Sequence, residues 1–326
     1  MPVISLTNQK GIAVKYRTAL TGILLTTVLS GPALAYSELV VFGDSLSDTG
    51  NLFALTESVT GTGQPGAPYV DGRFSNGPVA VETMASKLGL PLTDFAYGGA
   101  QTGLGNYGGA KLYGTGVQGQ VGMFADALGG ASADADALYV VWAGPNDFFA
   151  GANMLSGSTS TTASTNLLND IKGLYQLGAR HFFVPLMPNL GLTPASTAAE
   201  VGTPGYKAAA AQRSFEYNQL LTTGLATLSA SLAGAQIQSF DTAAFMAEQA
   251  ALLGGQGFNT TDACFNSSAK TVCANPDNYL FWDGVHPTAA AHALLGEAFV
   301  AAVPEPATVW SLMLGLGLLA WARRRA

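Results

Sequence analysis

Short apolar runs alternate with longer helical segments along most of the chain. Apolar runs of strand length occupy residues 39–42, 93–96, 138–142, 181–184 and 237–240. Segments with helical spacing or composition occupy residues 78–87, 121–128, 167–177, 206–232, 242–253 and 288–300. Because continuously apolar strands suit a parallel sheet that is covered on both faces, this order predicts βαβ units. The expected fold class is α/β: a three-layer α/β/α sandwich around a central, mostly parallel five-stranded sheet.

The N-terminal end differs in composition from the rest of the chain. Residues 1–35 place three basic residues ahead of an apolar run and finish on the small residues of Ala33-Leu34-Ala35. This order predicts a secretory signal peptide that is cleaved after Ala35. The alternative is an N-terminal membrane anchor, but the apolar run is short for a full span. Residues 36–302 are then the expected mature domain.

The C-terminal end, residues 303–326, is a second break in composition. It consists of Val303-Pro304-Glu305-Pro306, an apolar stretch and the basic cluster at residues 323–325. An apolar helix with arginines behind it predicts a stop-transfer tail, with the arginines in the cytoplasm. The three parts in this order resemble the PEP-CTERM sorting signal of Gram-negative bacteria. The resemblance implies transient anchoring in the inner membrane, an exosortase-type processing enzyme as a partner, and a final location at the cell surface or in the extracellular matrix.

Charge and cysteine content narrow the classes of function. The 326 residues carry a formal net charge of −7, and the only tight basic cluster is the one at residues 323–325. Nucleic-acid binding needs clustered Lys and Arg side chains, so no nucleic-acid partner is expected. The only cysteines, Cys264 and Cys273, predict one local disulfide in an exported protein, with two free thiols as the alternative. Two cysteines without a nearby histidine do not make a metal site.

The turn after the first predicted strand carries candidate chemistry. Residues 43–51 read G-D-S-L-S-D-T-G-N, which places Ser45 between a strand and a helix expected to begin near Ser47. Asp48 and Thr49 are the expected capping residues of that helix. A hydroxyl at this position is exposed, and the N–H groups of the helix can stabilise a developing anion. The alternative is an ordinary helix cap.

A serine needs a base to become a nucleophile, and the chain has three histidines. His286 follows Asp283 by three residues, ahead of the last predicted helix, so that a turn can bring both side chains to one site. The carboxylate would hold the imidazole in one tautomer and stabilise the imidazolium. His181, at the start of a strand, is expected to be structural, and His292, within the last helix, a surface or packing residue.

Four sequence blocks in order resemble the GDSL, or SGNH, hydrolase family. They are residues 43–51, residues 94–100 (D-F-A-Y-G-G-A), residues 144–147 (G-P-N-D) and residues 283–286 (D-G-V-H). Together they extend over nearly the whole of residues 36–302. The resemblance implies the flavodoxin-like SGNH fold and hydrolysis of esters by an esterase, lipase or lysophospholipase.

The resemblance also implies a role for individual residues. Ser45 is the nucleophile and its backbone N–H is one donor of the oxyanion hole. Gly99 supplies a second donor through its backbone N–H, and Asn146 a third through its side-chain amide. His286 is the general base and then the general acid, with Asp283 as its partner. Fixed donors aimed at the carbonyl oxygen lower the barrier to attack on an ester.

Several alternatives stay open beside these roles. The second block begins with Asp94 where the family often has asparagine, and Gly98 next to Gly99 is an alternative donor. Ser47 is a competing nucleophile, and Asn146 is alternatively a turn residue. Residues 72–78 and 184–191 resemble a lipase-like branch of the family and are expected either to border the acyl pocket or to be scaffold turns.

The sequence therefore predicts a secreted serine hydrolase that cleaves carboxylic esters. Its expected substrates are small-molecule, lipid or acylated-glycan esters, and no metal or organic cofactor is expected because the triad supplies the chemistry. One alternative is an acetyl esterase acting on extracellular polysaccharide. An alternative of another class is a non-catalytic matrix or adhesion protein on the same fold.

Overall fold

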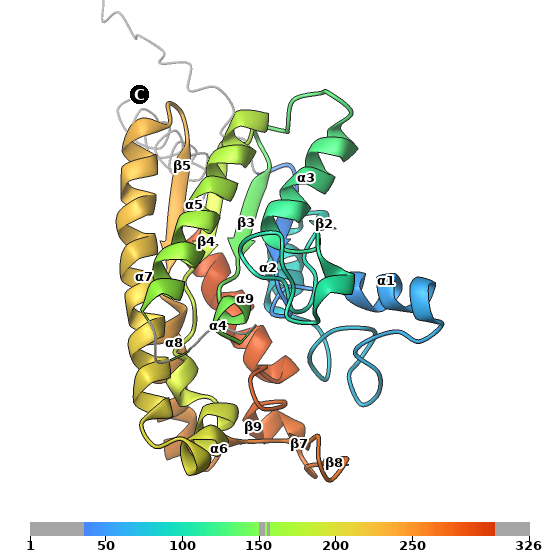
Figure 1. Cartoon of the computed structure of the whole chain (residues 1–326), viewed down its shortest axis with the longest axis vertical. Helices are drawn as coiled ribbons and strands as arrows, with labels where there is room; N and C mark the ends of the chain where they lie inside the picture. The colour runs from blue at the N-terminus through green and yellow to red at the C-terminus, as the bar shows by residue number, and fades with distance from the viewer. Residues whose placement is uncertain (1–35, 150–153, 155–156, 304–326) are drawn as a thin grey trace, which may run out of the picture.

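The predicted alternation of strands and helices forms a five-stranded parallel sheet (Figure 1). The computed structural model describes residues 36–149, 154 and 157–303. The strands are β1 (Leu39–Gly43), β2 (Leu92–Asp94), β3 (Leu138–Trp142), β4 (His181–Pro185) and β5 (Gln236–Phe240). Their order across the sheet is β2-β1-β3-β4-β5, and every neighbouring pair is parallel. The predicted sheet is thus confirmed.

Helices cover both faces of the sheet. One face packs against α3 (Val117–Leu128), α5 (Ser158–Leu177) and α7 (Tyr206–Ser231). The other face packs against α2 (Ala80–Leu88), α8 (Thr242–Gly255) and α9 (Ala289–Ala302). Alternation along β1 fits this arrangement, because Val40 and Phe42 belong to the first core while Leu39 and Val41 belong to the second. The fold is therefore the expected three-layer α/β/α sandwich.

Short polar side chains fix where several helices begin. The side chains of Thr193, Asp241 and Thr288 accept backbone N–H groups at the starts of α6 (Pro194–Gly202), α8 and α9. The first helix, α1 (Asn51–Thr60), begins later than the expected start near Ser47. The reason is that the Asp48 carboxylate accepts the backbone N–H groups of Gly50, Asn51 and Leu52, so Asp48 lies ahead of the helix rather than within its first turn.

The chain between β5 and α9 contains short strands that the apolar pattern does not predict. Strand β6 (Asn259–Ala263) pairs in parallel with β9 (Tyr279–Phe281), and β7 (Phe265–Asn266) forms a hairpin with β8 (Thr271–Val272). A disulfide joins Cys264 to Cys273 across this hairpin. Strands β7, β8 and β9 lie together at the lower end of Figure 1.

The remaining elements are α4 (Pro145–Phe149), η1 (Ala110–Leu112), η2 (Leu190–Leu192) and η3 (Pro276–Asn278).

Both predicted targeting segments lie outside the described residues. They are the signal peptide at residues 1–35 and, from residue 304 onward, the apolar tail and its arginines. Within the described part of the chain, no helix combines the length and the apolar character needed to cross a membrane.

Candidate active site

Ser45, His286 and Asp283 form one hydrogen-bonded row. The Nε2 atom of His286 lies 2.8 Å from the Ser45 hydroxyl oxygen. The Nδ1 atom of the same ring lies 2.7 Å from Oδ2 of Asp283 and 3.0 Å from Oδ1. Ser45 follows β1, while Asp283 and His286 lie in the loop between β9 and α9, so the fold brings together residues from opposite ends of the described chain.

The turn that holds Ser45 is closed by its neighbour Asp44. The backbone oxygen of Asp44 accepts the N–H groups of Ser47 and Asp48, at 3.0 and 2.9 Å. Its side-chain Oδ1 accepts the N–H of Leu46 at 3.0 Å. These bonds bend the chain sharply after the strand, which turns the Ser45 hydroxyl toward His286.

The Asp283 side chain closes the second turn in the same way. Its Oδ1 accepts the backbone N–H groups of Val285, at 2.9 Å, and of His286, at 2.8 Å. The backbone oxygen of His286 in turn accepts the N–H of Trp282 at 2.8 Å. The three-residue spacing between Asp283 and His286 therefore lets one carboxylate both shape the turn and contact the imidazole.

Asp283 and His286 each shift the pKa of the other toward the charged form. Burial alone would raise the pKa of Asp283, but the nearby His286, together with hydrogen bonds to the carboxylate, outweighs burial and lowers that pKa to about 2. Burial likewise favours neutral His286, but the Asp283 charge and hydrogen bond outweigh it and raise the imidazole pKa above its ordinary value. The site thus holds a stable carboxylate beside a histidine whose basicity is increased.

Backbone N–H groups and an amide lie on the loops around Ser45. The N–H of Gly98 is donated to Oδ2 of Asp48 at 2.6 Å, which leaves it unable to serve another acceptor. Among the described residues, the N–H groups of Gly99 and Ser45 have no acceptor. The amide of Asn146, at the start of α4, donates to the backbone oxygen of Ala100 at 3.1 Å. Of the two adjacent glycines, Gly99 is therefore the one whose backbone N–H can donate to a further acceptor.

Gly99 also requires glycine for conformational reasons. Its φ is +77°, in the left-handed region that favours glycine. A Cβ atom at this position would lie 2.6 Å from Oδ1 of Asn106, whose amide donates to the backbone oxygen of Gly98 at 2.9 Å. A side chain at Gly99 would consequently disturb the loop that presents its N–H.

Aspartate side chains connect the second sequence block to the first and the loop after it to the third. Asp94 accepts the N–H and the hydroxyl of Thr49, at 2.9 and 2.8 Å, so the departure from asparagine leaves a carboxylate that ties the second block to the first. Burial raises the pKa of Asp94 to about 7. Asp147, next to Asn146, accepts the N–H and the hydroxyl of Thr102 at 3.0 and 2.8 Å. These bonds hold the loop after β2 against α4.

The other polar candidates make no hydrogen bond to the Ser45 row among the described residues. The Ser47 hydroxyl is buried and has no hydrogen-bond partner among the described residues. His292 is fully buried and its Nδ1 accepts the N–H of Ala80 at 3.2 Å, which makes it a packing residue. His181 packs edge-on against Tyr36 with ring centroids 5.4 Å apart. Within the described ranges, no His, Cys, Asp and Glu side chains are grouped to hold a metal ion.

Two residues at the site carry no signal in the sequence. The hydroxyl of Tyr69 donates to Oδ2 of Asp283 at 2.6 Å, although 214 residues separate the two in the chain. Gln120, on α3, donates to the backbone oxygen of Gly43 at 2.8 Å and accepts its N–H at 2.9 Å. Neither residue belongs to a block with a recognisable spacing, so only the folded chain reveals these contacts.

A large cavity opens beside Ser45 and His286. Its volume is about 810 Å³, and most of its lining is apolar. Residues 72–78 contribute Phe74, and residues 184–191 contribute Pro188, Asn189 and Leu190. Both stretches therefore border the cavity, which is large enough for a substrate much bigger than an acetyl ester.

Comparison with known proteins finds a family model and relatives that match most of the chain. The family described as GDSL-like Lipase/Acylhydrolase matches residues 39–299, and the PEP-CTERM protein-sorting motif matches residues 302–326. The chain is 27% identical to a phosphatidylcholine-sterol acyltransferase of Aeromonas hydrophila, covering 87% of this chain and 95% of the relative. It is 28% identical to Esterase EstA of Pseudomonas aeruginosa, covering 89% of this chain and half of the relative.

A solved structure also aligns with most of the chain. It is a member of the lipolytic G-D-S-L family from Veillonella parvula, with a TM-score of 0.44 and 15% identity, covering 82% of this chain and 97% of the other. The family match extends from β1 into α9 and so includes all four blocks. The chain therefore belongs to the GDSL-like lipase/acylhydrolase family of ester hydrolases and carries a PEP-CTERM sorting motif at its C-terminal end.

Proposed function

We propose that this ester hydrolase acts on carboxylic esters through a Ser45–His286–Asp283 triad. The observation that carries the proposal is the 2.8 Å contact between His286 Nε2 and the Ser45 hydroxyl, on a ring whose Nδ1 is held by Asp283. Ser45 attacks the ester carbonyl as its proton moves to Nε2, and that proton then passes to the departing alcohol. Water, activated by the same nitrogen, releases the acid from the acyl-enzyme.

The oxyanion of each tetrahedral intermediate is assigned to three donors. They are the backbone N–H groups of Ser45 and Gly99 and the side-chain amide of Asn146. The absence of a competing acceptor at Ser45 and Gly99 within the described chain supports this assignment. The amide of Asn146 has two N–H donors, of which one donates to Ala100 and the other is left for the oxyanion. The two backbone donors have no acceptor among the described residues before the reaction, so they stabilise the developing charge without reorganisation.

The acyl group is proposed to be a medium or long chain. The cavity next to Ser45 has a volume of about 810 Å³ and includes the apolar side chains of Phe74, Phe149, Leu190 and Leu192. An acetyl group would leave most of this apolar surface in water, whereas a long chain would cover it. The Aeromonas relative is named for a phospholipid acyl donor, which agrees with a lipid substrate.

The site of action is proposed to be outside the cytoplasm. The PEP-CTERM motif at residues 302–326 supports export followed by processing by an exosortase-type enzyme. In this proposal, residues 1–35 are removed as a signal peptide and residues 303–326 anchor the chain transiently in the inner membrane. The mature domain, residues 36–302, then reaches the surface or the extracellular matrix.

A series of p-nitrophenyl esters tests this function. The full chain and its Ser45→Ala variant are compared on acetate, butyrate, octanoate and palmitate. We expect hydrolysis by the parent, a preference for octanoate or palmitate over acetate and butyrate, and no hydrolysis by the variant. Activity restricted to acetylated polysaccharide would instead identify an acetyl esterase. A folded parent that cleaves neither class of ester would identify a non-catalytic surface protein.

A further inference from the structure

A tyrosine hydroxyl contacts the carboxylate of the proposed triad. Tyr69 donates to Oδ2 of Asp283 at 2.6 Å, and the same oxygen lies 2.7 Å from Nδ1 of His286. The other oxygen, Oδ1, accepts the backbone N–H groups of Val285 and His286. Both oxygens of Asp283 therefore accept hydrogen bonds, and Tyr69 is the second side chain, besides His286, that contacts Oδ2.

Aromatic packing fixes the position of the Tyr69 ring. The ring meets Phe265 edge-on with centroids 5.7 Å apart, and it meets Trp282 at 6.3 Å and Phe74 at 6.1 Å. Phe265 and Trp282 are stacked on each other with centroids 5.8 Å apart. Because the ring is held on several sides, its hydroxyl has little freedom to leave Asp283.

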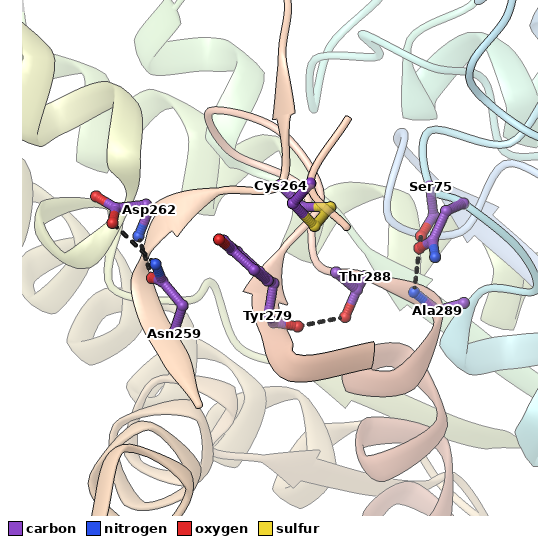
Figure 2. The surroundings of a disulfide bond; sticks show 9 residues. Ser75, Asn259, Asp262, Cys264, Tyr279, Thr288 and Ala289 are labelled. Atoms are coloured by element: carbon purple, nitrogen blue, oxygen red, sulfur yellow. Dashed lines mark hydrogen bonds between the residues drawn. A yellow bond between two sulfur atoms is a disulfide. The ribbon is translucent and has the colours of Figure 1, made fainter. Parts of the chain in front are cut away.

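The hairpin that the disulfide closes supplies Phe265, one of the rings that contact Tyr69. Phe265 is adjacent to Cys264, which is joined to Cys273. The N–H of Phe265 donates to the backbone oxygen of Trp282 at 2.6 Å, one residue before Asp283. Figure 2 shows the disulfide close to β9, where the Thr288 hydroxyl donates to the backbone oxygen of Tyr279. The hairpin, β9 and the Asp283 turn thus form one hydrogen-bonded unit that holds the Tyr69 ring.

We propose that Tyr69 is a positioning residue for the esterase reaction and acts through Asp283. Its hydrogen bond fixes the rotation of the carboxylate about the Cβ–Cγ bond, so that Oδ2 stays directed at Nδ1 when His286 gains a proton. Hydrogen bonds to charged groups are stronger than neutral ones, so without the Tyr69 hydroxyl only the backbone bonds to Oδ1, apart from the imidazole itself, would restrain the rotation of the carboxylate. This inference rests on the proposed triad.

A double-mutant cycle separates this role from a structural one. Four versions of the full chain are compared: the parent, Tyr69→Phe, Asp283→Ala and the double variant. Tyr69→Phe keeps the ring and removes only the hydroxyl. We expect it to lower kcat by roughly tenfold and to leave KM within about twofold of the parent. In the Asp283→Ala background the same change should alter kcat by less than about twofold, because no carboxylate remains for Tyr69 to hold.

The matched control is Tyr175→Phe, which removes a tyrosine hydroxyl bonded to the backbone oxygen of Ala233 at 3.0 Å, away from the site. It should leave kcat and KM unchanged. Equal effects of Tyr69→Phe in both backgrounds, or no effect in either, would overturn the positioning role while the parent remains an esterase. A parent that hydrolyses no ester and fails to react with an organophosphonate would instead overturn the proposed function, and the role of Tyr69 with it.

Discussion

The Nε2 atom of His286 lies 2.8 Å from the hydroxyl oxygen of Ser45, across 241 residues of sequence. The two residues occupy separate turns, one after β1 and one before α9, and each turn is closed by an aspartate side chain that accepts backbone N–H groups. The contact is therefore set by two local structures that the parallel sheet and the packing of α9 bring together. It is the geometry that a serine needs in order to lose its proton to a base.

The pH dependence of ester hydrolysis should report the state of His286. Protonated imidazole cannot accept the Ser45 proton, and Asp283 raises the imidazole pKa above its ordinary value despite burial. We therefore expect kcat/KM on p-nitrophenyl butyrate to be full at alkaline pH and to fall tenfold per pH unit below a midpoint above about 6.5. An activity that stays constant down to pH 5 would exclude His286 as the base.

Removing the Asn146 amide should slow the chemical step. We expect Asn146→Ala to lower kcat by about a hundredfold to a thousandfold with little change in KM, because the lost bond forms to the oxyanion and not to the ground-state ester. The control is Asn278→Ala, which truncates an exposed asparagine in η3. If both variants keep the parent kcat, Asn146 is a turn residue without a share in the oxyanion hole.

A charge in the cavity wall should change the preference for acyl length. Leu192 lines the cavity and is 46% exposed, so that replacing it does not disturb the core. Leu192→Asp should reduce kcat/KM for octanoate and palmitate about tenfold or more and spare acetate, because a long chain would have to desolvate the new carboxylate. Val201→Asp alters a residue of α6 that is 88% exposed and outside the cavity lining, and should change neither rate. Equal losses on acetate and palmitate would mean that Leu192 does not contact the acyl chain.

The carboxyl of Asp44 should make stability depend on pH. Burial, the largest influence, raises its pKa in the folded chain to about 7, whereas an unfolded aspartate ionises near pH 4. Between these values the folded chain binds the additional proton, so the free energy of unfolding decreases as pH rises from about 4 to 7. Asp44→Asn cannot ionise, and its unfolding free energy relative to the parent should increase over this range by an amount on the order of a few kcal/mol. Urea unfolding at several pH values measures this difference, and a constant difference would contradict it.

The sequence is sufficient to predict the sheet and most of its helices. Continuously apolar runs predict β1 and β3 because both faces of these strands are buried, as their residues are in the structure. The three-residue spacing of Asp283 and His286 likewise predicts a turn that joins them, since the Asp283 side chain needs only to reach backbone N–H groups nearby. Features decided by local spacing are thus accessible from the chain alone.

Features decided by contacts between distant segments are not accessible in this way. Nothing near Tyr69 indicates a bond to Asp283, because the bond depends on the packing of Phe265 and Trp282 around the ring. Similarly, the choice between Gly98 and Gly99 depends on Asp48, which accepts the Gly98 N–H. Strands β7, β8 and β9 have only two or three residues each and β6 is mostly polar, so they show no apolar periodicity.

Covalent labelling tests the central claim most directly. The full chain and its His286→Ala variant are treated with a p-nitrophenyl alkylphosphonate, and the modified peptide is located by mass spectrometry. We predict one adduct on the parent, at the Ser45 hydroxyl, and a much slower reaction in the variant, because the nucleophile then lacks its base. An adduct at Ser47 or at any other residue, or an equal rate in the variant, would contradict the proposed triad.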